Sequence, residues 1–153
     1  MRVYRLSKEK YARDLSGKGA ERAGGRWNSR GVPMVYSANS RALCVAEIAV
    51  HVPLGILPKD YFLVMLDIPD DSIGELSESS LPDTWKSFPH AESTQQLGNK
   101  YIEERDVLAL KVPSAVVQGE YNYLLNPLHA RFAEVKIVGA EPFEFDGRLF
   151  GLR

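Results

Sequence analysis

The chain has 153 residues, of which 44% are hydrophobic and 25% charged, a composition typical of one globular domain with its own core. Its 19 basic and 20 acidic residues nearly cancel, so no overall positive charge favours binding to nucleic acid or to a membrane surface. A single cysteine excludes an intrachain disulfide, the polar start does not resemble a signal peptide, and no apolar run is long enough to span a bilayer. We therefore expect a single cytoplasmic domain over residues 1–153.

The expected elements mix strands with a few helices. Residues 2–6 alternate like a strand, and the glycines of residues 17–31 predict a loop. A strand over residues 33–38 is followed by a helix that is capped by Asn39 or Ser40 and runs to about Val50. A second helix is expected at 92–105, and further strands at 61–68, 107–112, 121–125, 135–138 and 142–145. Because the order lacks regular βαβ alternation, it indicates the α+β class.

The helix after Ser40 contains an isolated acid. Glu47 is the only charged residue between Arg41 and His51, in a segment that is apolar on nearly every face, so we expect this helix to be largely buried. A buried carboxylate needs a partner because its desolvation is costly. Glu47 therefore either pairs with a core arginine for stability or faces a cleft as the acid of a functional site.

A glycine-rich block, Gly24-Gly25-Arg26-Trp27-Asn28, supplies candidate ligand contacts. Glycines let the backbone approach a ligand closely and donate N–H groups to phosphate. An arginine binds phosphate or carboxylate bidentately, and a tryptophan offers a stacking face. The alternative is a structural turn with Trp27 in the core.

Two further side chains are candidates. Tyr36, at the end of a strand, can stack on a planar ring or donate its hydroxyl, or it can be a core aromatic residue. Ser114 follows Pro113 after a strand, where a tight turn can expose its hydroxyl; otherwise it is a solvated loop serine. We expect Cys44 to be a buried, inert thiol, and the three histidines lack metal-ligand spacing, so no metal site is expected.

These segments, together with Gly31, Ala42 and Asn126-Pro127-Leu128-His129, resemble the RES domain family. The family is named for an arginine, a glutamate and a serine, which correspond here to Arg26, Glu47 and Ser114. The glycine-rich block and the spacing between Tyr36 and Glu47 are the more specific features, and the resemblance extends from Tyr4 to about Val138. It implies a fold similar to diphtheria-type ADP-ribosyltransferases, with mixed β-sheets and a few helices.

The resemblance also implies an activity and a partner. It implies a bacterial toxin that degrades NAD⁺ by cleaving the nicotinamide–ribose bond, through hydrolysis or phosphorolysis, with NAD⁺ as substrate and no prosthetic group. An Xre-type antitoxin would block the cleft in a hetero-oligomer and supply the DNA binding that this chain lacks. Two alternatives stay open: transfer of ADP-ribose to a protein at the same site, and a nucleotide-binding module without turnover.

Each candidate residue has an implied role. Cleavage of the bond builds oxocarbenium character at the ribose, and nicotinamide is a good leaving group, so one carboxylate is sufficient. Glu47 would stabilise the developing cation, and Arg26 would bind the pyrophosphate or position the ribose. Tyr36 would stack on the nicotinamide ring, and Ser114 would hydrogen-bond a group of the nicotinamide or the ribose. Trp27 and Asn28 would make further contacts with the substrate.

Overall fold

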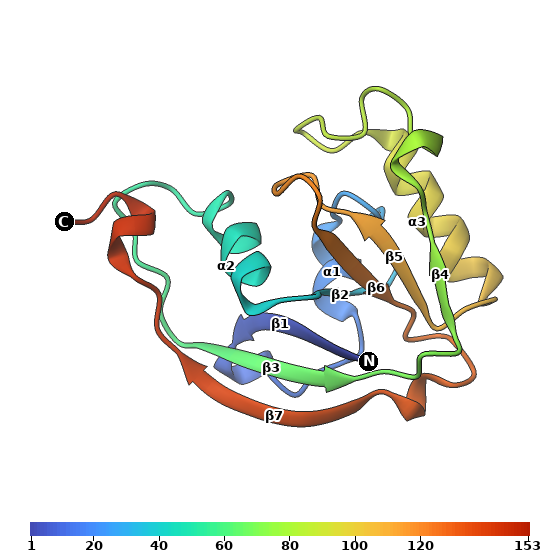
Figure 1. Cartoon of the computed structure of the whole chain (residues 1–153), viewed down its shortest axis with the longest axis horizontal. Helices are drawn as coiled ribbons and strands as arrows, with labels where there is room; N and C mark the ends of the chain where they lie inside the picture. The colour runs from blue at the N-terminus through green and yellow to red at the C-terminus, as the bar shows by residue number, and fades with distance from the viewer.

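The computed structural model describes residues 1–153 and contains one seven-stranded mixed sheet accompanied by three α-helices (Figure 1). Only β4 and β5 pair in parallel; every other pair is antiparallel. The α+β expectation is confirmed. No helix has the length and apolar character that a membrane span requires. In sheet order the strands are β4 (Ile73–Glu75), β5 (Ala109–Pro113), β6 (Tyr121–Leu125), β2 (Val35–Ala38), β1 (Arg2–Lys8), β3 (Tyr61–Asp67) and β7 (Lys136–Phe143).

The sheet is nearly divided between β1 and β2. These strands pair at one position, Tyr4 with Ala38, whereas β1 and β3 pair continuously from Arg2 to Lys8. The half formed by β1, β3 and β7 therefore diverges from the half formed by β2, β6, β5 and β4. Helix α2 (Arg41–Ala49) packs on both β1 and β2 and so lies over the junction (Figure 1).

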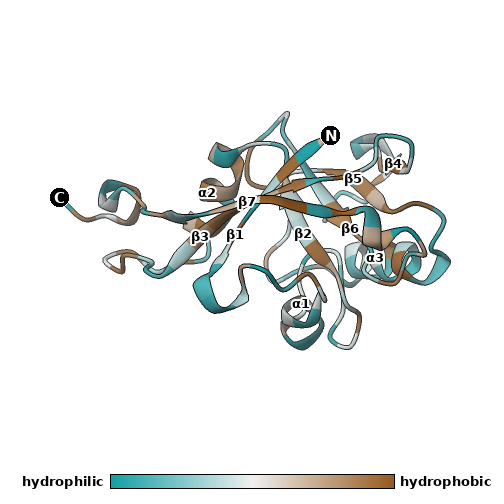
Figure 2. Ribbon diagram, turned by 90° about the horizontal axis from the view of Figure 1, so that it is seen from below, coloured by the Kyte–Doolittle hydropathy of each residue, from teal (hydrophilic) through white to brown (hydrophobic).

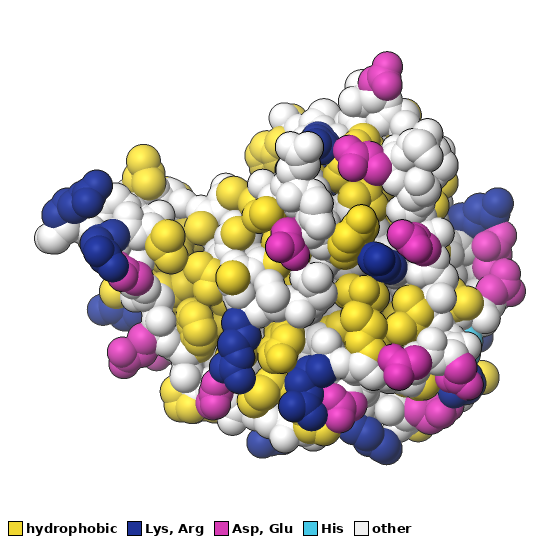
Figure 3. All heavy atoms as spheres, viewed as in Figure 1, with side chains coloured by type: hydrophobic (Ala, Val, Ile, Leu, Met, Phe, Trp, Pro, Cys, Tyr) yellow, Lys and Arg dark blue, Asp and Glu magenta, His cyan; other side chains and the backbone are white.

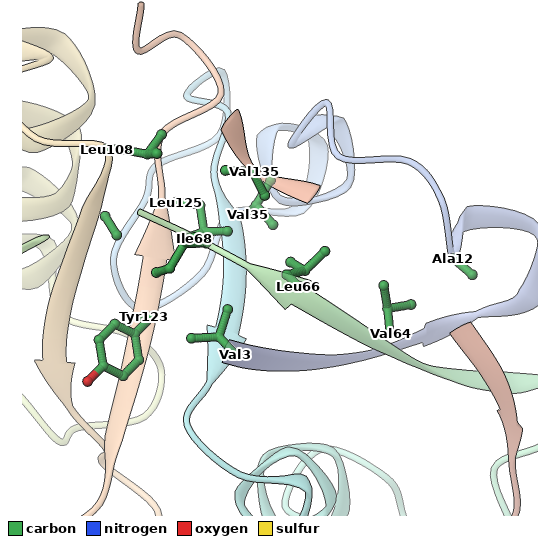
Figure 4. Close-up of a cluster of buried hydrophobic side chains, with 11 residues drawn as sticks. Val3, Ala12, Val35, Val64, Leu66, Ile68, Leu108, Tyr123, Leu125 and Val135 are labelled. Atoms are coloured by element: carbon green, nitrogen blue, oxygen red, sulfur yellow. The ribbon is translucent and has the colours of Figure 1, made fainter. Parts of the chain in front are cut away.

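Two apolar clusters pack on the sheet. The larger cluster spans both halves and joins β1 and β3 to β2, β5 and β6 through side chains such as Val3, Leu66 and Leu125 (Figure 4). The second lies between β5, β6 and helix α3 (Glu92–Glu104). Its buried members are Trp27, Met34, Trp85, Tyr101, Ile102, Val112 and Leu124. Hydrophobic residues accordingly concentrate in the strands, whereas much of α1 and the connecting segments is hydrophilic (Figure 2).

Helix α3 approaches the glycine-rich block very closely. A Cβ atom at Gly98 would lie 1.6 Å from the carbonyl oxygen of Trp27, so only glycine fits there. One turn later, the Tyr101 hydroxyl hydrogen-bonds to the carbonyls of Leu108 (2.7 Å) and Leu124 (2.9 Å). Helix α3 thus fixes the block against the second half of the sheet.

Three elements differ from the sequence expectations. A short helix α1 (Lys18–Ala23) lies within the expected loop, between Gly17 and Gly24, whose positive φ angles of 75° and 72° suit helix ends. A single strand, β7, replaces the two expected C-terminal strands, because Gly139 continues the strand and leaves room for the Met65 side chain opposite. Strand β4 was not expected at all, since its three residues give too short a pattern.

Candidate active site

A cavity of about 830 Å³ opens where the two half-sheets diverge. Ligand sites in proteins generally occupy about 300–1,000 Å³, so this cavity can hold a ligand as large as a dinucleotide. Arg26, Tyr36 and Glu47 all line it, as the sequence predicts for a common site. Its other walls include Tyr4, Arg5 and Leu6 of β1, Ser37 and Ala38 of β2, Cys44 and Ile48 of α2, and Val50, His51, Phe88, His90, Ala115, Val116 and Asn122.

Helix α2 positions Glu47 in the cavity wall. The helix begins as expected, because the Ser40 hydroxyl accepts a hydrogen bond from the backbone N–H of Leu43 at 3.1 Å. The expectation of a largely buried helix is wrong: only Leu43 and Cys44 are buried. One side of α2 packs on the sheet junction and another faces the cavity, so several apolar side chains stay accessible. Figure 3 shows hydrophobic side chains gathered on the surface over this part of the molecule.

Ser114 holds the Glu47 carboxylate. The Ser114 hydroxyl donates to Glu47 Oε1 at 3.0 Å, and its oxygen accepts the backbone N–H groups of Val116 and Val117, each at 3.1 Å. Because two N–H groups occupy the lone pairs of Oγ, the hydroxyl proton is directed at the carboxylate. Ser114 is only 3% exposed and does not line the cavity, so neither a solvated serine nor direct contact with a ligand describes it.

The Glu47 carboxylate has no ion-pair partner. None of the salt bridges of the chain includes it, so the alternative of a pair with a core arginine is wrong. Arg26 is near enough for an electrostatic interaction but not for a contact pair. Glu47 is half-buried, Oε1 is held by Ser114, and Oε2 has no hydrogen-bond partner in the chain. One carboxylate oxygen is thus fixed while the other remains available to a ligand.

The glycine-rich block is a tight turn built around Asn28. The Asn28 side chain is fully buried; it donates to the carbonyls of Ala20 (2.8 Å) and Val32 (3.0 Å) and accepts from the Tyr36 hydroxyl (2.6 Å). A Cβ atom at position 25 would lie 2.7 Å from that hydroxyl, which explains the glycine. The expected contact between Asn28 and a ligand is therefore not possible in this arrangement, because every polar atom of its side chain is already used.

Trp27 and Tyr36 differ in what they offer to a ligand. Trp27 lines the cavity, but it is only 3% exposed and its ring packs against Trp85 with ring centroids 6.3 Å apart, so the core alternative holds and the ring offers little surface for stacking on a ligand. The Tyr36 hydroxyl donates to Asn28 and accepts from the Trp27 backbone N–H at 3.1 Å. Burial raises the pKa of Tyr36 well above its usual value. Tyr36 can thus contribute its ring, not its hydroxyl, to the cavity.

Arg26 projects from the turn and joins two walls of the cavity. Its Nη1 donates to the backbone carbonyls of Trp85 at 2.7 Å and Ser87 at 3.0 Å, which ties the segment before α3 to the turn. Burial lowers the pKa of Arg26, and the nearby Glu47 and Tyr36 oppose that change, so the guanidinium stays charged. Its Nε and Nη2 have no partner in the chain and remain free to bind an anion.

Arg5 is a cavity residue that the sequence reasoning missed. It lies on β1, lines the cavity, and donates from Nη1 to the Asp14 carbonyl at 2.8 Å. Burial lowers the pKa of Arg5, again without removing its charge. The alternating pattern of the first strand placed a polar residue here but gave no sign that it faces a site. The cavity therefore contains two arginines and one carboxylate.

The remaining candidates have structural roles. Cys44 is buried, its thiol donates to the Tyr4 carbonyl at 3.2 Å, and burial together with Glu47 raises its pKa to about 12. His129 lies away from the cavity and shapes a turn, since its Nδ1 accepts the backbone N–H of Arg131 at 3.0 Å. No group of three or more metal-ligating side chains lies together anywhere in the chain.

Several known proteins are similar to this chain in sequence. Toxin Res of Photorhabdus laumondii is 38% identical over 151 residues, 97% of each chain. Toxin Res of Yersinia enterocolitica is 36% identical over 152 residues, covering 97% of this chain and 99% of that protein. The Prs ADP-ribosylating toxin of a Sphingobium species is 36% identical over 141 residues, covering 90% of this chain and 88% of that protein.

A solved structure has the same fold. It is the crystal structure of the M. tuberculosis MbcT–MbcA toxin–antitoxin complex, in which the matching chain has a TM-score of 0.73 and 21% identity and covers 98% of this chain and 86% of its own length. The family model for the RES domain matches residues 2–146. That range includes Arg26, Glu47 and Ser114, and the chain belongs to the RES domain family.

Proposed function

We propose that this chain is the toxin of a toxin–antitoxin pair and that it cleaves NAD⁺ between nicotinamide and ribose. The observation that carries the proposal is the Glu47 carboxylate, held on one oxygen by Ser114 and unpartnered on the other, in the wall of a cavity large enough for a dinucleotide. The relatives named as toxins support the biological role.

The chemistry needs one well-placed carboxylate. When the bond from C1′ of the ribose to the nicotinamide nitrogen breaks, its electron pair neutralises the pyridinium, and positive charge develops on the ribose ring. A carboxylate fixed before the reaction stabilises that charge without having to reorganise. The acceptor, water or phosphate, then adds to C1′ and loses a proton. Oε2 of Glu47 has the freedom to contact the ribose, while Ser114 acts on Glu47 and not on the substrate.

The cationic residues suit the pyrophosphate. Two arginines, Arg5 and Arg26, face one cavity in a chain with a net charge of −1, so the positive charge is local to this site. The free Nε and Nη2 atoms of Arg26 form the edge of the guanidinium that binds phosphate oxygens in pairs. The ring of Tyr36 supplies a face for the nicotinamide.

A second candidate is transfer of ADP-ribose to a protein. A relative that is 36% identical is named an ADP-ribosylating toxin, and this specific name favours the alternative. Both reactions share the bond cleavage at Glu47 and differ only in the acceptor that attacks C1′. Glu47 is only half-buried, which leaves room for either acceptor.

The test follows the adenine end of the substrate. Purified protein is incubated with NAD⁺ labelled in adenine, with and without phosphate and with and without cell extract, and the products are identified by mass. Free ADP-ribose indicates hydrolysis, ADP-ribose 1″-phosphate indicates phosphorolysis, and label attached to protein indicates transfer. Intact NAD⁺ under all conditions contradicts both reactions and favours a nucleotide-binding module without turnover.

The proposal includes an antitoxin partner of the Xre type. The similar solved structure is that of a toxin–antitoxin complex, and an active toxin of this kind has to be inhibited in its own cell. The test is to express the chain alone and together with the protein encoded beside it, measuring growth, cellular NAD⁺ and co-purification. Rescue of growth with a stable complex is expected. Normal growth and NAD⁺ with the chain alone contradict the toxin assignment.

A further inference from the structure

Three aromatic rings gather at one side of the cavity. Phe88 is 73% exposed; its ring centroid lies 6.0 Å from that of His51 and 5.3 Å from that of His90, the latter in an edge-on arrangement. All three residues line the cavity. A single exposed apolar side chain needs no explanation, but three planar side chains from two different segments at one ligand-sized cavity indicate a binding surface for a flat group.

This aromatic group and Glu47 are both near Arg26. His51 follows Glu47 by four residues, just after the end of α2. Phe88 and His90 come from a different segment, the one that Arg26 holds through the Trp85 and Ser87 carbonyls. Arg26 interacts electrostatically with both Glu47 and His90. One cation thus serves both the carboxylate and the aromatic group.

His90 has unused hydrogen-bonding capacity. Neither of its ring nitrogens has a partner in the chain, and Nδ1 is buried, a situation that is uncommon in native proteins. Burial, the charge of Arg26 and the neighbouring His51 all lower the pKa of His90. The imidazole is therefore neutral near pH 7, with one nitrogen that donates and one that accepts. A neutral purine, which presents ring nitrogens and an amino group, matches such a partner.

Building on the proposed function, we propose that Phe88, His51 and His90 form the subsite for the adenine base of NAD⁺, with the purine stacked on Phe88. The nicotinamide ribose would then lie at Glu47 and the adenine at the aromatic group, and Arg26, which interacts electrostatically with Glu47 and His90, would bind the pyrophosphate that joins the two halves. Stacking of a base on an aromatic side chain contributes about 10- to 100-fold in affinity.

The test measures binding of the two halves of the substrate separately. AMP and nicotinamide mononucleotide are titrated into the wild type and into Phe88→Ala, Phe88→Trp and Leu149→Ala, and binding is followed by NMR. Leu149→Ala is the matched control, since it removes an exposed apolar side chain outside the cavity. We expect Phe88→Ala to weaken AMP at least about 10-fold and the mononucleotide much less, and Phe88→Trp to restore AMP binding.

Each outcome decides the assignment. AMP binding that is absent in the wild type, or unchanged in Phe88→Ala, overturns the adenine subsite. A loss of mononucleotide binding as large as the loss of AMP binding also overturns it and places nicotinamide at Phe88. These measurements require no turnover. If the wild type binds AMP through Phe88 but cleaves no NAD⁺, the proposed function fails and the subsite stands.

Discussion

Replacing Ser114 by alanine removes the one hydrogen bond that the Glu47 side chain accepts. Hydrogen bonds to charged groups contribute about 1.5–3 kcal/mol, and each 1.36 kcal/mol corresponds to a factor of ten in rate. If the bond serves to hold Glu47 in its catalytic position, kcat for NAD⁺ cleavage falls by about 10- to 150-fold. KM changes little, because Ser114 does not line the cavity.

The same substitution affects stability, and this effect needs a control. Ser114→Ala also removes the acceptor of the Val116 and Val117 N–H groups, which costs about 1–3 kcal/mol and lowers Tm by about 2–12 °C. Ser72 is a matched control: it is buried, its hydroxyl accepts the Leu108 N–H at 2.9 Å, and it lies outside the cavity. Ser72→Ala should therefore lower Tm without lowering kcat.

The assay is steady-state kinetics with NAD⁺ on both variants at a temperature where both are folded. A kcat within twofold of the wild type in Ser114→Ala refutes the positioning role. A rise in KM at unchanged kcat refutes it differently, since that result means that Ser114 touches the substrate directly.

Three further predictions concern the cavity walls. Arg26→Lys should lower kcat/KM at least about 10-fold and speed hydrogen exchange in residues 85–90. The reason is that a lysine ammonium cannot donate to the two backbone carbonyls and bind an anion at the same time, as the planar guanidinium can. Unchanged exchange and kinetics contradict this prediction. Gly25→Ala should lower the free energy of unfolding by about 1–3 kcal/mol, because the added Cβ atom meets the Tyr36 hydroxyl. Gly19→Ala is the control, since the space around Gly19 is open, and thermal unfolding of the two variants should show a loss only for Gly25→Ala. Cys44, whose pKa is about 12, should resist iodoacetamide at pH 8 when folded and react when unfolded; rapid alkylation of the folded protein, measured by mass, refutes its burial.

Local signals predicted the elements that position the site. The Ser40 cap, the apolar helix after it and the strand that ends at Ala38 are each encoded within a few residues, and the structure has all three. The lone charge at Glu47 correctly indicated a cavity, because a carboxylate in an apolar helix needs either a partner or access to solvent.

Contacts between distant segments were beyond the sequence pattern. Ser114 and Glu47 are 67 residues apart, so nothing local reveals their hydrogen bond. The burial of Trp27 depends on the close approach of α3 at Gly98, and a glycine inside a helical pattern gives no indication of which backbone it admits. Phe88 and His51 lie on different segments, and their contact follows from tertiary packing that no local pattern reveals.

The most direct measurement of the central claim is NAD⁺ turnover by Glu47→Gln. Glutamine keeps the size and the contact with Ser114 but removes the negative charge, so the fold should persist while the rate falls by at least about 100-fold. Glu103→Gln, at an exposed position of α3, is the matched control and should keep the wild-type rate. Loss of NAD⁺ cleavage in Glu47→Gln alone, with unchanged Tm, is the predicted result. Turnover by Glu47→Gln within a few-fold of the wild type contradicts the assignment of Glu47 as the group that stabilises the ribosyl cation.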